Sequence, residues 1–194
     1  IESVYKGDYD GAASALISRT EKTHQATLSE TKWALCMAKL SNQVVLKECP
    51  SKEAHAKLRD RKIDNKLELV GVQKELLEEG ISGLSKSQSE QHLWSAHRLL
   101  DLAMDKVDRA TASGNKSRRE NATRYCYLAL LICITYDDLE SQRRHAARVW
   151  AKSITVDWDN NLWTDWIQNE NDLGSPELAE TVLDKTVFGG LLKD

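Results

Sequence analysis

The stretch LWSAHRLLDLAMDKVDRA, residues 93–110, decides the fold class of this 194-residue chain. Its apolar residues recur at steps of three and four, at Leu93, Ala96, Leu100, Ala103, Val107 and Ala110. This spacing places all six side chains on one face of an α-helix, which indicates an amphipathic helix packed on a core. No stretch of the sequence shows the alternation of apolar and polar residues that is typical of a half-buried strand.

The next segment towards the C-terminus, YCYLALLICITY at residues 125–136, is apolar on every side. Its length is about half of the ~20 residues that a membrane span needs, so we expect no span here. A helix that is apolar all round and this short is typical of the centre of a helical core. The sequence therefore predicts buried side chains at Leu128, Leu131, Ile132 and Ile134.

Further helices are expected on both sides of this pair. Upstream, a first helix is expected over Asp8–Lys22. A second helix starts at a Thr27–Glu30 capping box and stops before Pro50, and a long third helix covers Ser51–Glu79. In the long helix the apolar stripe slips by one residue between Leu58 and Ile63. Downstream lie residues 139–154, a short helix after Asp159, and a last helix from Ser175–Pro176 to Gly189 and Gly190.

Short connections favour antiparallel hairpins, so the predicted fold is all-α, an α-solenoid or helical-repeat-like bundle of about eight helices. The composition agrees, with 41% hydrophobic and 29% charged residues and only two prolines. Residues 1–80 are expected to hold N-terminal hairpins with the long helix, and residues 81–89 a Gly- and Ser-rich loop. Residues 90–194 are expected to hold C-terminal hairpins packed in the same domain.

The stretch YKGDYDGAASAL, residues 5–16, suggests a hairpin turn and its returning helix. It resembles the tetratricopeptide repeat at Gly7, Asp8, Tyr9 and Ala12, and residues 146, 150 and 153 repeat the small–large–small spacing of such a helix. No clean period of 34 residues is found. The resemblance implies a degenerate helical repeat that binds a peptide or protein. It also suggests a fragment whose first hairpin, with Tyr5 and Tyr9, could pair with a second copy as a homodimer.

Six tryptophans form the strongest aromatic signal, and three of them fall in DWDNNLWTDW at Trp158, Trp163 and Trp166. One interpretation is a core plug that closes the last hairpins. The other is an exposed anchor for a protein partner, because Trp and Tyr dominate binding hot spots. Acidic residues interleave these rings, so single-stranded nucleic acid is a poor ligand for them.

Charge is unevenly distributed along a chain whose net charge is −3. Residues 116–152 carry eight Lys or Arg against four acids, whereas residues 157–194 carry nine acids against two Lys. One interpretation is a pair of solvated faces. The other is an anion-binding face for phosphates or an acidic peptide, with candidate residues Arg119, Arg124, Arg143, Arg144 and Arg148.

Catalytic and metal signatures are missing from the sequence, and we expect no cofactor and no metal site. The four cysteines, with Cys36 and Cys133 inside apolar helical stretches, are predicted to be reduced and mostly buried. This points to a cytoplasmic or nuclear protein. The leading hypothesis is a non-catalytic scaffold or adaptor that binds another protein. The alternatives are a nucleic-acid-associated module that uses residues 116–152, and a small all-α enzyme with an unrecognised site.

Overall fold

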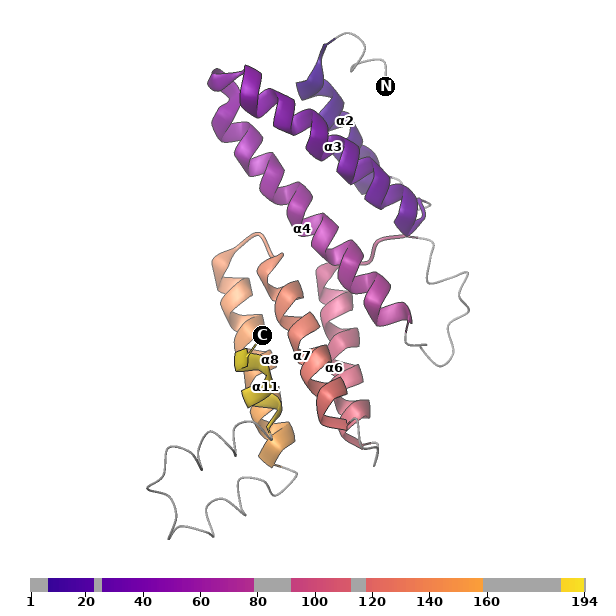
Figure 1. The fold of residues 1–194 in the computed structure, drawn as a ribbon, viewed down its shortest axis with the longest axis vertical. Helices are drawn as coiled ribbons and strands as arrows, with labels where there is room; N and C mark the ends of the chain where they lie inside the picture. The colour runs from indigo at the N-terminus through magenta and orange to yellow at the C-terminus, as the bar shows by residue number, and fades with distance from the viewer. Residues whose placement is uncertain (1–6, 23–25, 79–91, 113–117, 159–185, 194) are drawn as a thin grey trace. The chain divides into compact units, whose positions relative to one another are not determined.

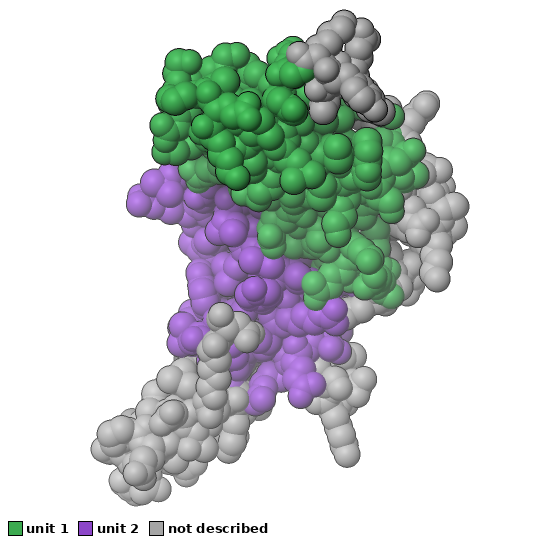
Figure 2. All heavy atoms as spheres, turned by 45° about the horizontal axis from the view of Figure 1, so that its top comes forward, with its two compact units in different colours: residues 1–95 green, residues 96–194 purple. Residues whose placement is uncertain are grey.

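The computed structural model describes residues 7–22, 26–78, 92–112, 118–158 and 186–193, and within them the secondary structure is helical with no strand. The helices are α2 (Tyr9–Lys22), α3 (Leu28–Glu48), a 3₁₀ turn η1 (Pro50–Lys52), α4 (Glu53–Glu78), α6 (Ala96–Ala112), α7 (Arg118–Ile134), α8 (Leu139–Trp158) and α11 (Val187–Lys193) (Figure 1). The all-α prediction is therefore confirmed. The chain divides into two units, residues 1–95 and 96–194, which Figure 2 colours separately. The predicted loop at residues 81–89 lies outside the described residues.

In the first unit, α3 packs against both α2 and α4 (Figure 1). Its core centres on Leu35, Ala38, Ile63 and Val70. Partly buried side chains from every helix of the unit close around these four, namely Leu16, Ile17, Leu28, Leu67 and Leu93. The three helices thus share one core, with α3 in the middle.

The predicted helix starts of this unit are confirmed. Gly7 adopts the left-handed φ of 72°, which glycine reaches at no steric cost, and the chain turns there into α2. The Asp8 carboxylate accepts a 2.9 Å hydrogen bond from the Gly11 amide, which satisfies a donor at the start of the helix. At α3, Thr27 and Glu30 form the full capping box, and Glu30 Oε2 lies 2.8 Å from the Thr27 amide.

The slip in the apolar stripe of α4 has a physical explanation. The residues that face the core are Ala56, Arg59 and Ile63, whereas Leu58 is 62% exposed. An arginine therefore occupies the core-facing position that the sequence pattern assigns to an apolar residue. It can do so because ion pairing and hydrogen bonds satisfy the two terminal nitrogens of its guanidinium.

The prediction that Leu93 lies within the next helix is wrong. Helix α6 starts at Ala96, and Leu93 packs instead against the core of the first unit. The side chain of the fully buried Gln73 fixes this segment, because its Nε2 donates to the His92 carbonyl (2.9 Å) and its Oε1 accepts from the Trp94 amide (2.7 Å). The other members of the seam lie within α6, where Leu100, Ala103 and Val107 are buried.

The second unit is built around α7, which packs against α6, α8 and α11. Its large, fully buried side chains are Leu99, Leu100, Val107, Leu128, Ile132, Val149 and Val187. Asp138 turns the chain into α8 and caps it, since its Oδ1 accepts a 2.6 Å hydrogen bond from the Ser141 amide.

Burial of α7 follows the prediction at two positions of four. Leu128 and Ile132 are buried, but Leu131 is only partly buried and Ile134 is 58% exposed. The buried face contains the small residues Ala122 and Ala129, which let neighbouring helices approach closely. Ile134 is the last residue of the helix, where the chain leaves its neighbours to turn.

The last helix also departs from expectation, because Gly189 and Gly190 lie inside α11 and do not end it. Thr186 caps this helix, with its Oγ1 accepting from the Gly189 amide at 2.8 Å. A Cβ atom added to Gly190 would lie 2.8 Å from Thr123 Cγ2 of α7. Glycine is therefore required where α11 approaches α7 most closely.

Candidate protein-interaction surface

The outer face of α3 carries a line of apolar side chains, which we call the α3 stripe: Trp33, Cys36, Met37, Leu40 and Val44. Steps of three and four place these residues on one side of the helix. Trp33 is 54% exposed, Leu40 is 63% exposed, Cys36 is exposed, and Met37 and Val44 are partly exposed. A continuous exposed line of this kind differs from scattered apolar residues, which need no explanation.

The opposite face of α3 explains why the stripe is left bare. That face is rich in small residues, including Ala34, Ala38 and Ser41, and α2 and α4 both pack against this helix. Asn42 locks the contact with α4, because its Nδ2 donates to the Ala56 carbonyl at 2.8 Å and to Asp60 Oδ1 at 3.2 Å. Both neighbours are thus held on one side of α3, and the other side carries the stripe.

A cavity of about 400 Å³ adjoins one end of the stripe. Trp33 forms part of its wall, together with Arg19, Thr20, Ala26, Ser29, Glu30, Thr31 and Ala34. A partner that contacts Trp33 could therefore place a side chain beside the indole as well as on top of it.

The edges of the stripe carry unlike charges. Lys32 and Lys39, seven residues apart, lie along one edge, which is the one next to α4 because Lys39 forms an ion pair with Asp64. Lys47 follows Leu40 by seven residues and therefore extends the stripe beyond its C-terminal end. That pair raises the pKa of Lys39. Lys32 and Lys47 have no ion-pair partner among the described residues, and Glu48 lies on the other edge.

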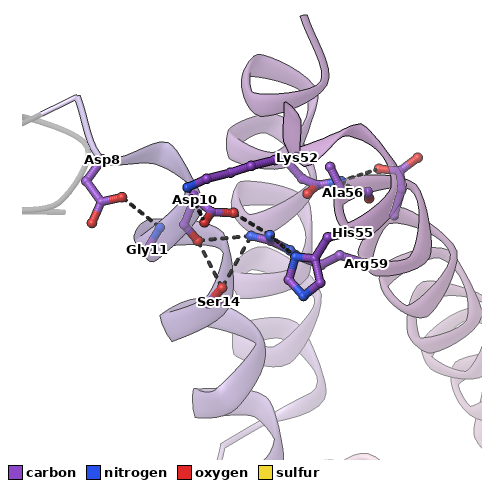
Figure 3. Close-up of polar contacts among 10 residues, drawn as sticks. Asp8, Asp10, Gly11, Ser14, Lys52, His55, Ala56 and Arg59 are labelled. Atoms are coloured by element: carbon purple, nitrogen blue, oxygen red, sulfur yellow. Dashed lines mark hydrogen bonds and ion pairs between the residues drawn. The ribbon is translucent and has the colours of Figure 1, made fainter. Parts of the chain in front are cut away.

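Behind the stripe, a polar network holds the first turn of α2 against α4 (Figure 3). Arg59 is only 6% exposed, and its Nη1 donates to the Asp10 carbonyl at 2.9 Å and to Ser14 Oγ at 3.3 Å. Its Nη2 pairs with the Asp10 carboxylate and lies 2.9 Å from His55 Nδ1. Lys52 binds the other Asp10 oxygen at 2.8 Å. Hydrogen bonds from Lys52 and Arg59 lower the pKa of Asp10 to about 2.

A second hollow, of about 250 Å³, lies between α2 and α4. Ile17 and the exposed Leu58 line it, with Arg59 at one end and Glu21, which pairs with Lys66 at 2.8 Å, at the other. Ion pairs at its two ends connect α2 and α4 across the hollow. This hollow is smaller and more polar than the cavity beside Trp33, so Leu58 is a suitable reference position for tests of the stripe.

Most of the aromatic residues predicted to bind a partner cannot be compared with the structure. Tyr5, Trp163 and Trp166 lie outside the described residues, and of Trp158 only the backbone, at the end of α8, is described. Tyr9 is the first residue of α2 and is half-buried. Trp33 is not among the predicted binding residues, although its spacing to Met37 and Leu40 indicates one helix face.

The five predicted anion-binding arginines are all exposed, but they do not form one group. At 1.5 Å per residue, Arg119 lies about 20 Å along α7 from the turn that joins α7 to α8, whereas Arg144 lies along α8 within about 8 Å of that turn. Arg148 pairs with Asp101 at 3.5 Å, and Lys152 pairs with Asp108. Acids of α6 therefore neutralise part of this basic region.

Near the turn between α7 and α8 the structure brings together three rings whose contact the sequence pattern does not predict. The ring of Tyr136 stacks on that of His145 at 4.6 Å, and His97 meets His145 edge-on at 6.0 Å. Burial, followed by the charges of Arg144 and of neighbouring residues, lowers the pKa of His145. Burial raises the pKa of Tyr136. The cluster joins α6, α8 and the turn between α7 and α8, with Asp101 of α6 near both His97 and Arg148.

The cysteine prediction is wrong for Cys36, which is exposed on the α3 stripe. It holds for Cys126 and Cys133, which are buried, and all four thiols are free. Burial raises the pKa of Cys133 to about 11, so this thiol is protonated at neutral pH. No helix among the described residues is long and apolar enough to cross a membrane.

Comparison with known proteins finds no matching family model, no similar curated protein and no similar solved structure.

Proposed function

We propose that this chain is a non-catalytic scaffold that binds another protein through the α3 stripe. The observation that carries the proposal is the exposure of Trp33 and Leu40 at 54% and 63%, at two positions seven residues apart on one helix face. Burying an apolar side chain of this size on a partner contributes about 1.5–3 kcal/mol. A tryptophan at the end of the stripe beside a cavity is the kind of anchor that binding hot spots use.

The rigidity of the unit supports the same proposal. Asn42 ties α3 to α4, and Arg59 ties α4 to α2, so the helix that bears the stripe is supported on its opposite side. A surface that is held in its bound shape before the partner arrives loses less conformational entropy on binding.

The nucleic-acid alternative is less favoured by the charges. Two of the cations in residues 116–152, Arg148 and Lys152, already pair with acids of α6. Affinity for nucleic acid depends on how many phosphates the protein neutralises, and pairing within the protein lowers that number.

Affinity capture with the full chain tests the proposal, using a matched pair of variants. Leu40→Asp places a charge on the α3 stripe, and Leu58→Asp does the same at an equally exposed position, 62% against 63%, in the hollow between α2 and α4. We expect wild type and Leu58→Asp to retain the same protein from a nuclease-treated lysate, and Leu40→Asp to lose it.

The captured protein should then bind purified wild-type chain in a calorimeter, with an affinity at least about tenfold lower for Leu40→Asp. Equal loss with both variants would indicate a general effect on folding, which circular dichroism would reveal. Capture that needs Leu58 but not Leu40, or that disappears with nuclease, would overturn the proposal.

A further inference from the structure

The shape of the α3 stripe restricts the partner. From Trp33 to Val44 the stripe covers three helical turns, about 16 Å, and is one side chain wide. The backbone groups of α3 are bonded within the helix, so the stripe offers no free strand edge to an extended peptide. A second helix, whose own apolar residues recur at steps of three and four, can interdigitate with such a line over its whole length.

The charges beside the stripe restrict the partner further. Lys32, on the edge next to α4, and Lys47, beyond the C-terminal end of the stripe, are exposed and have no ion-pair partner among the described residues, while Lys39 is engaged with Asp64. These two lysines are fifteen residues apart, about 22 Å, and so lie near the two ends of the stripe. A helix laid along the stripe would bring one of its ends close to each ammonium group.

We infer that the α3 stripe receives an amphipathic helix of the partner protein, with apolar residues along its contact face and carboxylates near its two ends, where it meets Lys32 and Lys47. This inference rests on the proposed function and names the chemistry of its partner. The apolar face supplies the affinity, and the carboxylates set which helix binds. The cavity beside Trp33 accepts a side chain from one end of that helix.

A second copy of the chain does not suit the stripe. If two α3 helices paired antiparallel about a twofold axis, like edges would meet, and Lys32 of one copy would lie near Lys47 of the other.

The test uses two fluorescein-labelled synthetic helices of about five turns that share one leucine stripe. One carries glutamates near both ends, where it would meet Lys32 and Lys47, and the other carries lysines at the same positions. Fluorescence anisotropy of each peptide is measured with the full chain at low and high salt. Three variants accompany wild type: Leu40→Asp, Leu58→Asp, and the charge reversal Lys32→Glu with Lys47→Glu.

We expect wild type to bind the glutamate-bearing helix with about threefold to tenfold higher affinity than the lysine-bearing helix at low salt, and with a smaller difference at high salt. The charge reversal should invert that preference, Leu40→Asp should weaken both peptides by about tenfold or more, and Leu58→Asp should match wild type. Circular dichroism of each variant confirms that the helices remain folded.

Each other outcome overturns the inference. If both peptides bind equally and binding still depends on Leu40, the inference of acidic residues on the partner helix is wrong, but the proposed function is not contradicted. If neither peptide binds, the inference of a helical partner is wrong, and the capture experiment tests the proposed function separately. Sedimentation that shows a wild-type dimer, dissociated by Leu40→Asp, would assign the stripe to a second copy.

Discussion

Replacing Asp10 by Asn removes the carboxylate that faces a guanidinium in the interior of the first unit. Arg59 is 6% exposed, whereas the Asp10 side chain is 30% exposed and also binds Lys52. After the replacement Arg59 keeps its 2.9 Å bond to the residue 10 carbonyl and its 3.3 Å bond to Ser14 Oγ. The buried cation then has hydrogen bonds but no opposite charge beside it.

The expected loss of unfolding free energy is about 2 kcal/mol at neutral pH. Removing one partner of a fully buried ion pair costs about 3–5 kcal/mol. Here solvent reaches one partner, and the guanidinium keeps neutral acceptors, so the cost should be lower. Arg59→Met is the matched variant, because it removes the buried charge and keeps most of the apolar volume. Its cost should be below about 1 kcal/mol, since hydrophobic replacement of a buried pair is often nearly neutral.

The pH dependence provides an independent check. The pKa of Asp10 is about 2 in the folded chain and 3.8 in the unfolded chain, so the pair stabilises the fold above about pH 4. This stabilisation, about 1–2 kcal/mol after allowance for solvent screening, is lost as pH falls from about 4 to 2. The Asn variant lacks the titrating group, so its stability relative to wild type should improve over the same window.

Urea denaturation with hydrogen exchange at the amides of α2 measures these values in the first unit without averaging over the whole chain. The decisive comparison is the order of the two variants at neutral pH. If Arg59→Met destabilises α2 as much as Asp10→Asn does, or if the difference between wild type and Asp10→Asn is the same at pH 2 and pH 6, the argument from an unpaired buried charge is wrong.

Other predictions compare matched positions. Ile132→Ala, at a buried site in α7, should lower the unfolding free energy by about 2–5 kcal/mol, whereas Ile134→Ala, 58% exposed, should cost less than about 1 kcal/mol in chemical denaturation. Gly190→Ala should weaken protection of α11 in hydrogen exchange, because its Cβ would meet Thr123 at 2.8 Å. Gly71→Ala should instead stabilise α4 by about 0.5–1 kcal/mol, since nothing lies within 4 Å of its Cβ position, and a fall in melting temperature would contradict this. A thiol reagent at neutral pH should label Cys36 rapidly and Cys133 only after urea is added, and fast labelling of both would show that the second unit opens readily.

Local signals in the sequence predicted the helix starts well, because each depends on a few neighbouring residues. The Thr27–Glu30 box, Asp8 before α2 and the turn at residues 137–138 all act within four residues of the helix they start. Positions such as Arg59 and Leu93 could not be assigned in this way. Their surroundings come from residues far along the chain, Asp10 for one and the core of the first unit for the other.

The candidate site was missed for a related reason. Apolar residues occur nearly all round α3, and such a helix is usually assigned to the interior, as α7 was. Whether it is enclosed depends on how many neighbours pack around it, which periodicity does not encode. In the described residues α3 packs against α2 and α4, and α7 against three helices of its own unit.

This difference in the number of neighbours connects the fold with the proposed function. A helix that packs on two neighbours leaves the rest of its surface uncovered, and in α3 the largest side chain, Trp33, lies on that uncovered side. An apolar face of this kind adds nothing to the stability of the unit while it is solvated, and it favours association with other chains. A partner helix that covers it would add a third neighbour, giving α3 the same enclosure that α7 already has.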